Sequence, residues 1–293
     1  MTAHVIGIDG GGTSCRAALT GRDGVVSGTG KSGAANILTD MNGGVRHIIE
    51  AAQRACDDAG LRGELSSMDV LLGLAGANMD ASVEALRGRL PFRRCEIESD
   101  ALIAVHGALG EADGVVAIIG TGAVFAAKQG SSVRTIGGWG FVVGDQGSGA
   151  ALGQELMRRT LLAHDGVGPA SDVTGRLFSE FGGEPQKVVA YAHGAPPGAF
   201  ARYAPMVFEY AQRNDPVATA IIVEAAGQID AFIDAMVGTE LQRLCLLGGL
   251  AGPYEPWLAD KHRARIVPAQ GDALDGAAQL ARQRFLMTGD VRV

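Results

Sequence analysis

Short glycine runs next to a carboxylate or a hydroxyl group are the parts of this sequence best suited to bind phosphate. In the first run, Asp9–Thr13, three consecutive glycines separate an aspartate from a threonine. Glycine has no Cβ, so a ligand can approach the backbone closely, and successive N–H groups can bind an anion. Asp9 ends an apolar segment, where a carboxylate is costly unless a cation such as Mg²⁺ accompanies it. For this run alone, an ordinary hairpin with a turn aspartate is an equal alternative.

Two further glycine runs have the same character. Thr121 stands between Gly120 and Gly122 and offers a hydroxyl group beside backbone N–H donors, so two such hairpins facing each other would hold the phosphates of a nucleotide. Gly248 and Gly249 follow an apolar segment, where backbone without side chains would let a base or ribose lie against it. A plain turn is the alternative for the first of these runs, and a helix-entry turn for the second. The sequence has neither a Walker A motif nor a dinucleotide-binding GxGxxG motif.

Two more aspartates stand where they could bind a hydroxyl group. Asp100 opens a predicted helix, whose N-terminus stabilises an anion, so that an ionised Asp100 would accept a proton from a hydroxyl group. An N-cap is the simpler interpretation of Asp100. The glycine-rich run Gly137–Gly149 contains Trp139 and Asp145, which would offer a flat surface and a hydrogen-bond acceptor to a sugar. A core tryptophan with an Asx turn is the alternative.

The composition excludes several classes of protein. The chain has 293 residues, 47% of them hydrophobic, which predicts two packed domains and not a disordered chain. Its net charge of −7 argues against a nucleic-acid binder. The longest stretch without a charged residue, Gly114–Ala127, is too short to span a membrane. We see no signal peptide and expect a cytoplasmic protein with reduced thiols, because no CxxC pair occurs among the four cysteines, Cys15, Cys56, Cys95 and Cys245.

Alternating apolar segments predict two α/β units of similar design. The predicted strands are Val5–Asp9, Cys15–Thr20, Val25–Gly30, Met68–Ala75 and Cys95–Glu98, then Val115–Gly120, Ala123–Ala127, Val133–Ile136, Leu244–Leu247 and the pair Ile266 and Val267. Helices are predicted at Val45–Ala55, Ser82–Leu90, Asp100–Leu109, Ala150–Ala163, Tyr203–Arg213, Val217–Met236 and Asp272–Arg284. The likeness of Leu71–Gly76 to Leu246–Gly252 indicates a duplication, with extra helical material in the second half.

These segments, in this order, resemble the actin/Hsp70/sugar-kinase superfamily and, within it, the N-acetylglucosamine kinase and bacterial glucosamine kinase group of the BadF-type ATPase family. The resemblance is carried by Ile6–Ala17, Ser32–Ile37, Ser99–Ala101, Gly120–Gly122, Gly144–Ala150, Gly248–Gly249 and Gly271–Ala278. It spans the chain, is specific before Gly153 and is weak from about His164 to Thr239. It implies an α/β fold with two RNase H-like (actin-like ATPase) domains. The first comprises residues 1–112, and a C-terminal helix at about 272–293 packs with it. The second comprises residues 113–271 and has a helical insertion at about 150–240.

The resemblance also implies a role for each motif. ATP would be bound at three places. The first phosphate loop would be Gly10, Gly11, Gly12 and Thr13, and the second would be Thr121 and Gly122. Gly248 and Gly249 would contact the adenosine. Asp9 would lie near Mg²⁺. The sugar would be surrounded by Asn36, Asp100, Gly138, Trp139, Gly140 and Asp145, with Asp100 as the catalytic base.

The implied reaction is transfer of the γ-phosphoryl group of MgATP to the 6-hydroxyl of an amino sugar. N-acetylglucosamine is slightly favoured, because Trp139 would suit its neutral acetamide, whereas cationic glucosamine calls for a carboxylate near its C2 amine. In the resemblance, the N-acetylglucosamine kinases keep this tryptophan and the bacterial glucosamine kinases lack it.

Three alternatives stay open: a glucosamine kinase proper, a nucleotide-driven actin-like ATPase, and a sugar sensor without kinase activity. A DNA-binding sensor is disfavoured, because the first strand begins at Val5 and leaves no room for a preceding helix-turn-helix. The iron–sulfur activators of the same family are discounted, because the cysteines form no cluster motif. We expect no nucleic-acid or membrane partner. The sequence does not decide between a monomer and a homodimer, nor does it reveal the pathway or the role of the insertion.

Overall fold

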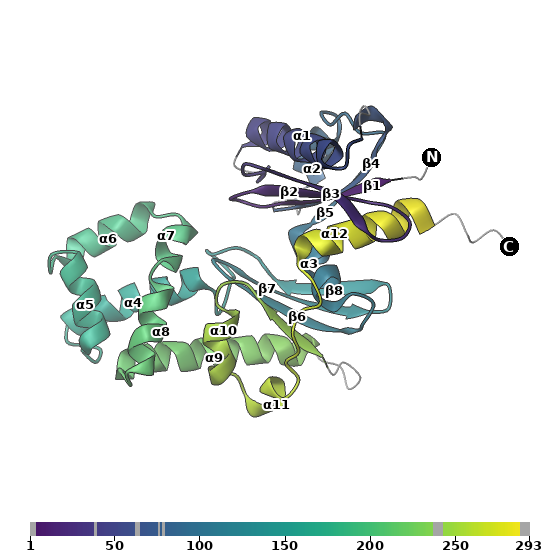
Figure 1. Ribbon diagram of the computed structural model, residues 1–293. Coiled ribbons are helices and arrows are strands. Elements are labelled where there is room, and N and C mark those ends of the chain that lie inside the picture. Colours follow the sequence, from purple (N-terminus) through teal and green to yellow (C-terminus); the bar gives the residue numbers. More distant parts are fainter. Residues whose placement is uncertain are drawn as a thin grey trace. The chain divides into compact units, whose positions relative to one another are not determined.

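The computed structural model describes residues 4–37, 40–61, 65–75, 77, 80–236 and 243–287 (Figure 1). The chain forms two compact units: unit 1 comprises Met1–Ala112 and Ala269–Val293, and unit 2 comprises Asp113–Pro268. The last residues of the predicted insertion, 237–240, and of the predicted C-terminal helix, 288–293, lie outside the described residues.

Unit 1 is built on a five-stranded sheet with the order β3-β2-β1-β4-β5. Strands β1, β2 and β3 are antiparallel neighbours, whereas β1, β4 and β5 run parallel, so the carboxyl ends of these three strands share one edge of the sheet. The elements of unit 1 are β1 (Val5–Gly10), β2 (Cys15–Thr20), β3 (Val26–Ser32), α1 (Met41–Asp58), a 3₁₀ turn (Leu65–Ser67), β4 (Asp69–Leu74), α2 (Asp80–Arg87), β5 (Arg94–Ser99), α3 (Asp100–Leu109), α12 (Ala273–Arg282) and a π-helical turn (Gln283–Met287).

Strand β1 is buried on both faces because helices cover both sides of the sheet. Ile6 and Ile8 belong to the core that α1 covers, while Val5, which precedes Ile6, packs with α3 and α12 on the other face. Successive strand residues point to opposite faces, so a nearly continuous apolar run is what such a strand requires. Gly7 lets α12 come close: a Cβ there would lie 2.3 Å from the backbone nitrogen of Ala278. Figure 1 shows α12 alongside this sheet.

Unit 2 repeats the strand arrangement with one strand fewer, in the order β8-β7-β6-β9, where β6 pairs antiparallel with β7 and parallel with β9. Its elements are β6 (Gly114–Ile119), β7 (Ala123–Gln129), β8 (Ser132–Gly137), α4 (Gly149–His164), α5 (Asp172–Glu180), α6 (Pro185–Gly194), α7 (Pro197–Ala201), α8 (Ala204–Gln212), α9 (Pro216–Met236), β9 (Leu244–Leu247), α10 (Ala251–Tyr254), a 3₁₀ turn (Glu255–Trp257) and α11 (Asp260–Arg263).

Six helices, α4 to α9, stand between β8 and β9 and form much of the core of unit 2. Within the described residues, α9 is the one helix long and apolar enough, by length and composition, to cross a membrane. The sequence did not suggest it, since α9 contains Glu224, Asp230 and Asp234. Its buried side chains, among them Ile222 and Ile229, belong to the core of unit 2, as expected of a core helix.

Unit 2 differs from the predicted elements in its helices and in one strand. Helices α5, α6, α7, α10 and α11 were not predicted. The predicted strand at Ile266 and Val267 is wrong: Ile266 forms only an isolated bridge with Leu244, and Pro268, which has no backbone N–H, follows at once.

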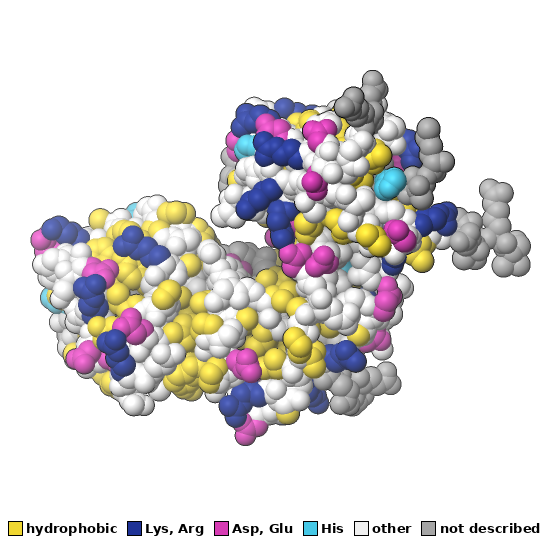
Figure 2. Space-filling model, viewed as in Figure 1, with side chains coloured by type: hydrophobic (Ala, Val, Ile, Leu, Met, Phe, Trp, Pro, Cys, Tyr) yellow, Lys and Arg dark blue, Asp and Glu magenta, His cyan; other side chains and the backbone are white. Residues whose placement is uncertain are grey.

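Charged side chains of both signs are interspersed on the visible face of each unit (Figure 2). On that face, Lys and Arg side chains do not gather into one basic patch of the kind that binds a nucleic-acid backbone.

Candidate active site

Asp9 and Asp100 lie at the same edge of the unit 1 sheet. In the parallel register, Asp9 is level with Gly73 of β4, and Gly73 is level with Glu98 of β5. Asp100 follows the last residue of β5 and is the first residue of α3. The carboxyl edge of parallel strands is where α/β folds usually bind ligands.

The first glycine run forms the hairpin between β1 and β2. The N–H of Gly11 donates to the carbonyl oxygen of Ser14 (2.9 Å), while Gly12 and Thr13 are exposed at the tip. No atom lies within 4 Å of the position that a Cβ on Gly12 would occupy. The backbone of the tip is therefore open to a ligand.

The segment that carries Asn36 is attached to this hairpin. The N–H of Ala35 donates to the carbonyl oxygen of Gly11 (2.9 Å), so Asn36 follows a residue bonded directly to the glycine run. His47 on α1 holds the same segment through a hydrogen bond between Nδ1 and the carbonyl oxygen of Ala34 (2.6 Å). Unit 1 thus brings together its predicted phosphate loop, Asn36 and the Asp9–Asp100 edge.

Asp9 is held by an arginine that the sequence analysis did not single out. Arg16, the cross-strand neighbour of Asp9, donates to Asp9 Oδ2 from Nη2 (2.6 Å) and Nε (3.2 Å). Its third bond, from Nη1, goes to Asp272 Oδ2 (2.6 Å), and Asp272 is the N-cap of α12. Arg16 therefore links the first hairpin to the C-terminal helix. No local pattern reveals this link, because Asp272 is 256 positions away in the chain.

Asp100 does not act as a helix cap, so that alternative interpretation is wrong. The N-cap of α3 is Ser99, whose hydroxyl accepts from the N–H of Leu102 (3.2 Å). Asp100 Oδ1 accepts from the N–H of Ala101 (2.9 Å), and the residue keeps an exposed surface. Partial desolvation, helped by the negative charge of Asp9, raises the pKa of the Asp100 carboxyl. A carboxylate with a raised pKa is a stronger base.

In unit 2, the second glycine run forms the hairpin between β6 and β7. The N–H of Gly120 donates to the carbonyl oxygen of Gly122 (2.9 Å). The N–H groups of Gly149 and Ala150, at the start of α4, donate to the carbonyl oxygens of Gly120 (2.8 Å) and Thr121 (3.2 Å). Backbone hydrogen bonds thus join this hairpin to the N-terminus of α4, the end of a helix that favours anions.

Gly248 and Gly249 lie beside this second hairpin. Gly248 has φ +90°, and a Cβ there would lie 2.3 Å from the carbonyl oxygen of Ile119, the residue before the glycine run. The N–H of Leu250 donates to that same oxygen (3.1 Å). Only glycine fits at position 248. Unit 2 therefore brings its predicted phosphate loop and its predicted adenosine contact together.

The segment Gly137–Gly144 displays Trp139 on a glycine-rich backbone. Gly137, Gly138 and Gly140 have positive φ, and Trp139 is 78% exposed, so the alternative of a core tryptophan is wrong. Asp145 holds the segment in place, because its carboxylate accepts hydrogen bonds from the N–H groups of Ala123 and Gly140. Burial raises the pKa of the Asp145 carboxyl. Asp145 is 8% exposed, and its bonds to backbone give it a structural role in addition to any contact with a sugar.

The residues of unit 1 fit a magnesium ion held mainly by phosphate and water. Within the described part of the chain, no group of three or more His, Cys, Asp or Glu side chains could hold a metal ion. Mg²⁺ commonly takes only one or two carboxylates and completes its shell with water and nucleotide phosphates. The two hydrogen bonds that Arg16 donates to Asp9 go to one oxygen, Oδ2. The negative charge of Asp9 is also near enough to Asp100 to repel the Asp100 carboxylate. A divalent cation would offset this repulsion.

The fold and these sites define a member of the BadF/BadG/BcrA/BcrD ATPase family, to which the chain belongs: the family model matches residues 6–280. The glucosamine kinase GspK of Vibrio cholerae is 34% identical over 95% of both chains. An N-acetyl-D-glucosamine kinase of Dictyostelium discoideum is 27% identical over 79% of this chain and 78% of its own. A crystal structure from Chromobacterium violaceum, named provisionally as an N-acetylglucosamine kinase, is 32% identical with a TM-score of 0.84 and covers 96% of this chain and 99% of its own. The predicted family and the predicted actin-like fold are confirmed.

Proposed function

We propose that this chain is an ATP-dependent kinase that phosphorylates the 6-hydroxyl of an amino sugar, with N-acetylglucosamine favoured over glucosamine. Membership of an ATPase family supports the use of ATP, and relatives named as glucosamine and N-acetylglucosamine kinases support an amino sugar as the acceptor. We place the activity in the cytoplasm, where ATP and sugars meet. The observation that carries the proposal is the place of Asp100, which is exposed at the carboxyl edge of the sheet that also carries Asp9 and the first glycine hairpin.

In this proposal, Asp100 accepts the proton of the 6-hydroxyl as the hydroxyl attacks the γ-phosphorus. The transition state of phosphoryl transfer is loose, so positioning and charge neutralisation contribute most, and a general base adds a factor of about 10²–10⁴. Asn36 would orient the sugar in unit 1, and Trp139, Gly138, Gly140 and Asp145 would do so in unit 2.

Each hairpin offers backbone donors suited to a phosphate group. Gly10–Thr13 offers an exposed tip, and Thr121 and Gly122 lie at the N-terminus of α4. Gly248 and Gly249 would contact the adenosine. Asp9 would hold Mg²⁺ through Oδ1 or through a water molecule, and the bound ion would neutralise phosphate charge.

Substitution of Asp100 by asparagine tests this assignment. Asn keeps the acceptor for the Ala101 N–H but cannot take up a proton, so Asp100→Asn should bind the sugar and lose about 10²–10⁴ in kcat. Equilibrium sugar binding and coupled ADP release measure the two properties separately. A kcat within threefold of the wild type would remove Asp100 from this role.

The choice of amino sugar depends on the exposed apolar side chains of unit 2. Trp139 is joined by Val142 (90% exposed) and Val143 (77% exposed) within five positions, and this surface suits the methyl group of an acetamide. The 34% identical relative supports glucosamine as the second candidate. Side-by-side kcat/KM for the two sugars decides, and a tenfold preference for glucosamine would reverse our choice.

A nucleotide-driven ATPase or a sugar sensor is distinguished by the dependence of ADP release on sugar. A kinase releases ADP at full rate only when amino sugar is present, because the sugar hydroxyl is the acceptor of the phosphoryl group. Equal ADP release with and without amino sugar would favour the ATPase, and sugar binding with no ADP release would favour the sensor.

A further inference from the structure

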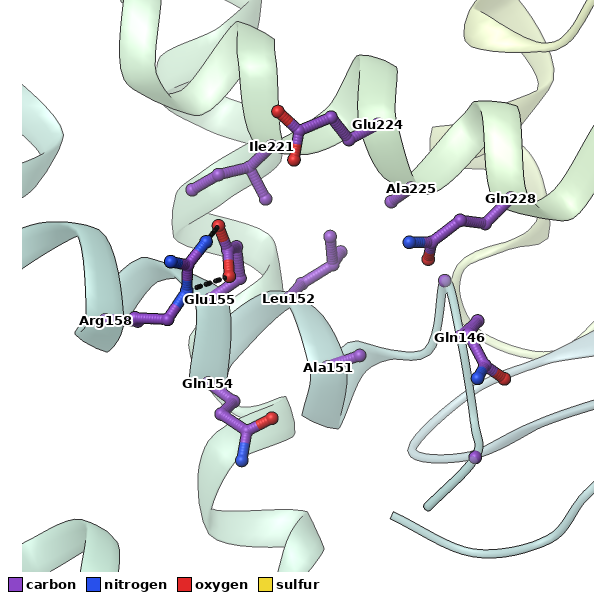
Figure 3. Close-up of a pocket in the computed structure, with 12 residues that line it drawn as sticks. Gln146, Ala151, Leu152, Gln154, Glu155, Arg158, Ile221, Glu224, Ala225 and Gln228 are labelled. Atoms are coloured by element: carbon purple, nitrogen blue, oxygen red, sulfur yellow. Dashed lines mark hydrogen bonds and ion pairs between the residues drawn. The ribbon is translucent and has the colours of Figure 1, made fainter. Parts of the chain in front are cut away.

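Unit 2 contains a groove of about 330 Å³ between α4 and α9, closed at one end by the segment 144–147. Its floor is apolar and buried, formed by Leu152 of α4 with Ile221 and Ala225 of α9. Figure 3 shows Leu152 and Gln228 extending from their two helices into the space between them. Ligand pockets usually start at about 300 Å³, so the groove has the size for one small ring.

Three carboxamides line the groove above this floor: Gln146 from the closing segment, Gln154 from α4 and Gln228 from α9. Each carboxamide has two N–H donors and an acceptor oxygen, so the three together can serve both the hydrogens and the lone pairs of hydroxyl groups. An apolar floor with amides at its rim matches a molecule with C–H faces and hydroxyl edges.

The charges along the groove are already paired. Glu155 accepts from Arg158 (Nη2, 2.5 Å) and from Arg159 (Nε, 2.7 Å), and the dashed lines of Figure 3 mark the first of these pairs. Arg159 also donates to both oxygens of Glu224 (2.7 Å each). Two carboxylates and two guanidinium groups balance, so this network attracts neither an anion nor a cation strongly. A phosphate group would have to break one of these pairs and would face two carboxylates.

The groove adjoins the residues proposed to hold the phosphoryl acceptor but includes none of them: Gly144, which lines the groove, lies against Trp139. The Asp145 carboxylate is bonded to the backbone of Ala123 and Gly140, on the side of the β6–β7 hairpin. The next residue, Gln146, lines the groove. Asp145 thus bonds to the backbone beside the hairpin, whereas its neighbour Gln146 lines the groove.

We propose that this groove is a second binding site, for a neutral hydroxyl-rich molecule the size of one sugar ring. Its paired charges would admit an unphosphorylated sugar and reject a sugar phosphate. The inference goes beyond the proposed kinase function, since it concerns binding to α4 and α9 and requires no phosphoryl transfer.

Hydrogen–deuterium exchange of the full chain tests this site, with N-acetylglucosamine at about 10 mM as the probe and no nucleotide present. Binding in the groove should slow amide exchange in α4 and α9 by about twofold or more. The same concentration of N-acetylglucosamine 6-phosphate should leave these helices unchanged. Equal slowing by the phosphate would overturn the inference of a neutral ligand.

Removal of the carboxamides locates the effect. In the double variant Gln154→Leu with Gln228→Leu, the slowing over α4 and α9 should disappear, because the hydroxyl partners are lost while the exposed positions keep their volume. Gln212→Leu, at an exposed position on α8 outside the groove, is the matched control and should keep the slowing. If the double variant keeps the slowing, or the wild type shows none, the groove is not a sugar site. The readout does not depend on kinase activity, so failure of the proposed function is seen separately.

Discussion

The two edges of the unit 1 sheet carry aspartates in opposite electrostatic surroundings. At the edge where β4 begins, Asp69 is bonded by Arg93 (2.7 Å) and by Arg94. At the other edge, Asp9 shares a single arginine with Asp272, and Asp100 stands near the negative charge of Asp9. Burial alone would raise the pKa of Asp69, but the two arginines lower it to about 2. The pKa of Asp100 is raised.

This difference separates a carboxylate that stabilises the fold from one that is available for chemistry. Perturbation toward a higher pKa, beside a like charge at a ligand-binding edge, is typical of functional sites, whereas a matched ion pair is typical of structure. The edge with Asp100 therefore needs another source of stability. The crossing of α3 and α12 supplies it, because both helices pack on the same face of the sheet.

Substitution at this crossing should have the largest effect on stability. A Cβ on Gly107 of α3 would lie 1.8 Å from the carbonyl oxygen of Asp272, which is backbone and cannot move aside alone. Gly107→Ala should therefore push α12 away from α3 and cost about 2–4 kcal/mol in the free energy of unfolding. Urea unfolding followed by circular dichroism measures it, since both tryptophans, Trp139 and Trp257, belong to unit 2.

A glycine in an open helical position is the matched control. Gly175 on α5 has no atom within 4 Å of the position of a Cβ. Gly175→Ala should leave stability unchanged or raise it by up to about 1 kcal/mol, through helix propensity. A loss in Gly107→Ala no greater than in this control would show that the edge is not held by the crossing.

Removal of the structural carboxylate should have an intermediate and pH-dependent effect. Because the folded pKa of Asp69 is depressed to about 2, its contribution is complete above its ordinary pKa of 3.8 and is lost as the pH falls through about 2. Asp69→Asn should lower the free energy of unfolding by about 1–2 kcal/mol at pH 7, a value reduced for the exposure of both arginines. The difference from the wild type should shrink between pH 4 and pH 2. A difference that does not change with pH would rule out the ion pairs as its source.

The sequence was sufficient for the parts of the site that depend on local pattern. A glycine run between two strands specifies a hairpin, so Gly10–Thr13 and Gly120–Gly122 were predicted in their observed places. The transition from strand to helix placed Asp100 at the end of β5. Period-two and helical patterns are properties of neighbouring residues, which a single sequence displays.

The contacts between distant residues could not be predicted in the same way. Nothing near Arg16 indicates that it bonds Asp272, and nothing in the weak pattern of the insertion separates α5, α6 and α7. Ile266 and Val267 look like a strand because they are β-branched, but among the described residues their pairing is limited to Leu244. Tertiary context decides such cases against local propensity.

The smallest expected effect has the opposite sign to that of Asp69 and is the sharpest test of the comparison. Because the folded pKa of Asp100 is raised, ionisation of this group costs stability at neutral pH. Asp100→Asn should therefore raise the free energy of unfolding at pH 7, by less than about 1 kcal/mol because solvent screens the exposed carboxylate. The gain should vanish below the ordinary pKa of 3.8, where Asp100 is protonated in both states. Urea unfolding of the wild type and of Asp100→Asn at pH 7 and at pH 3.5 measures this difference. If Asp100→Asn is less stable than the wild type at pH 7, the two edges of the sheet do not differ in the way described.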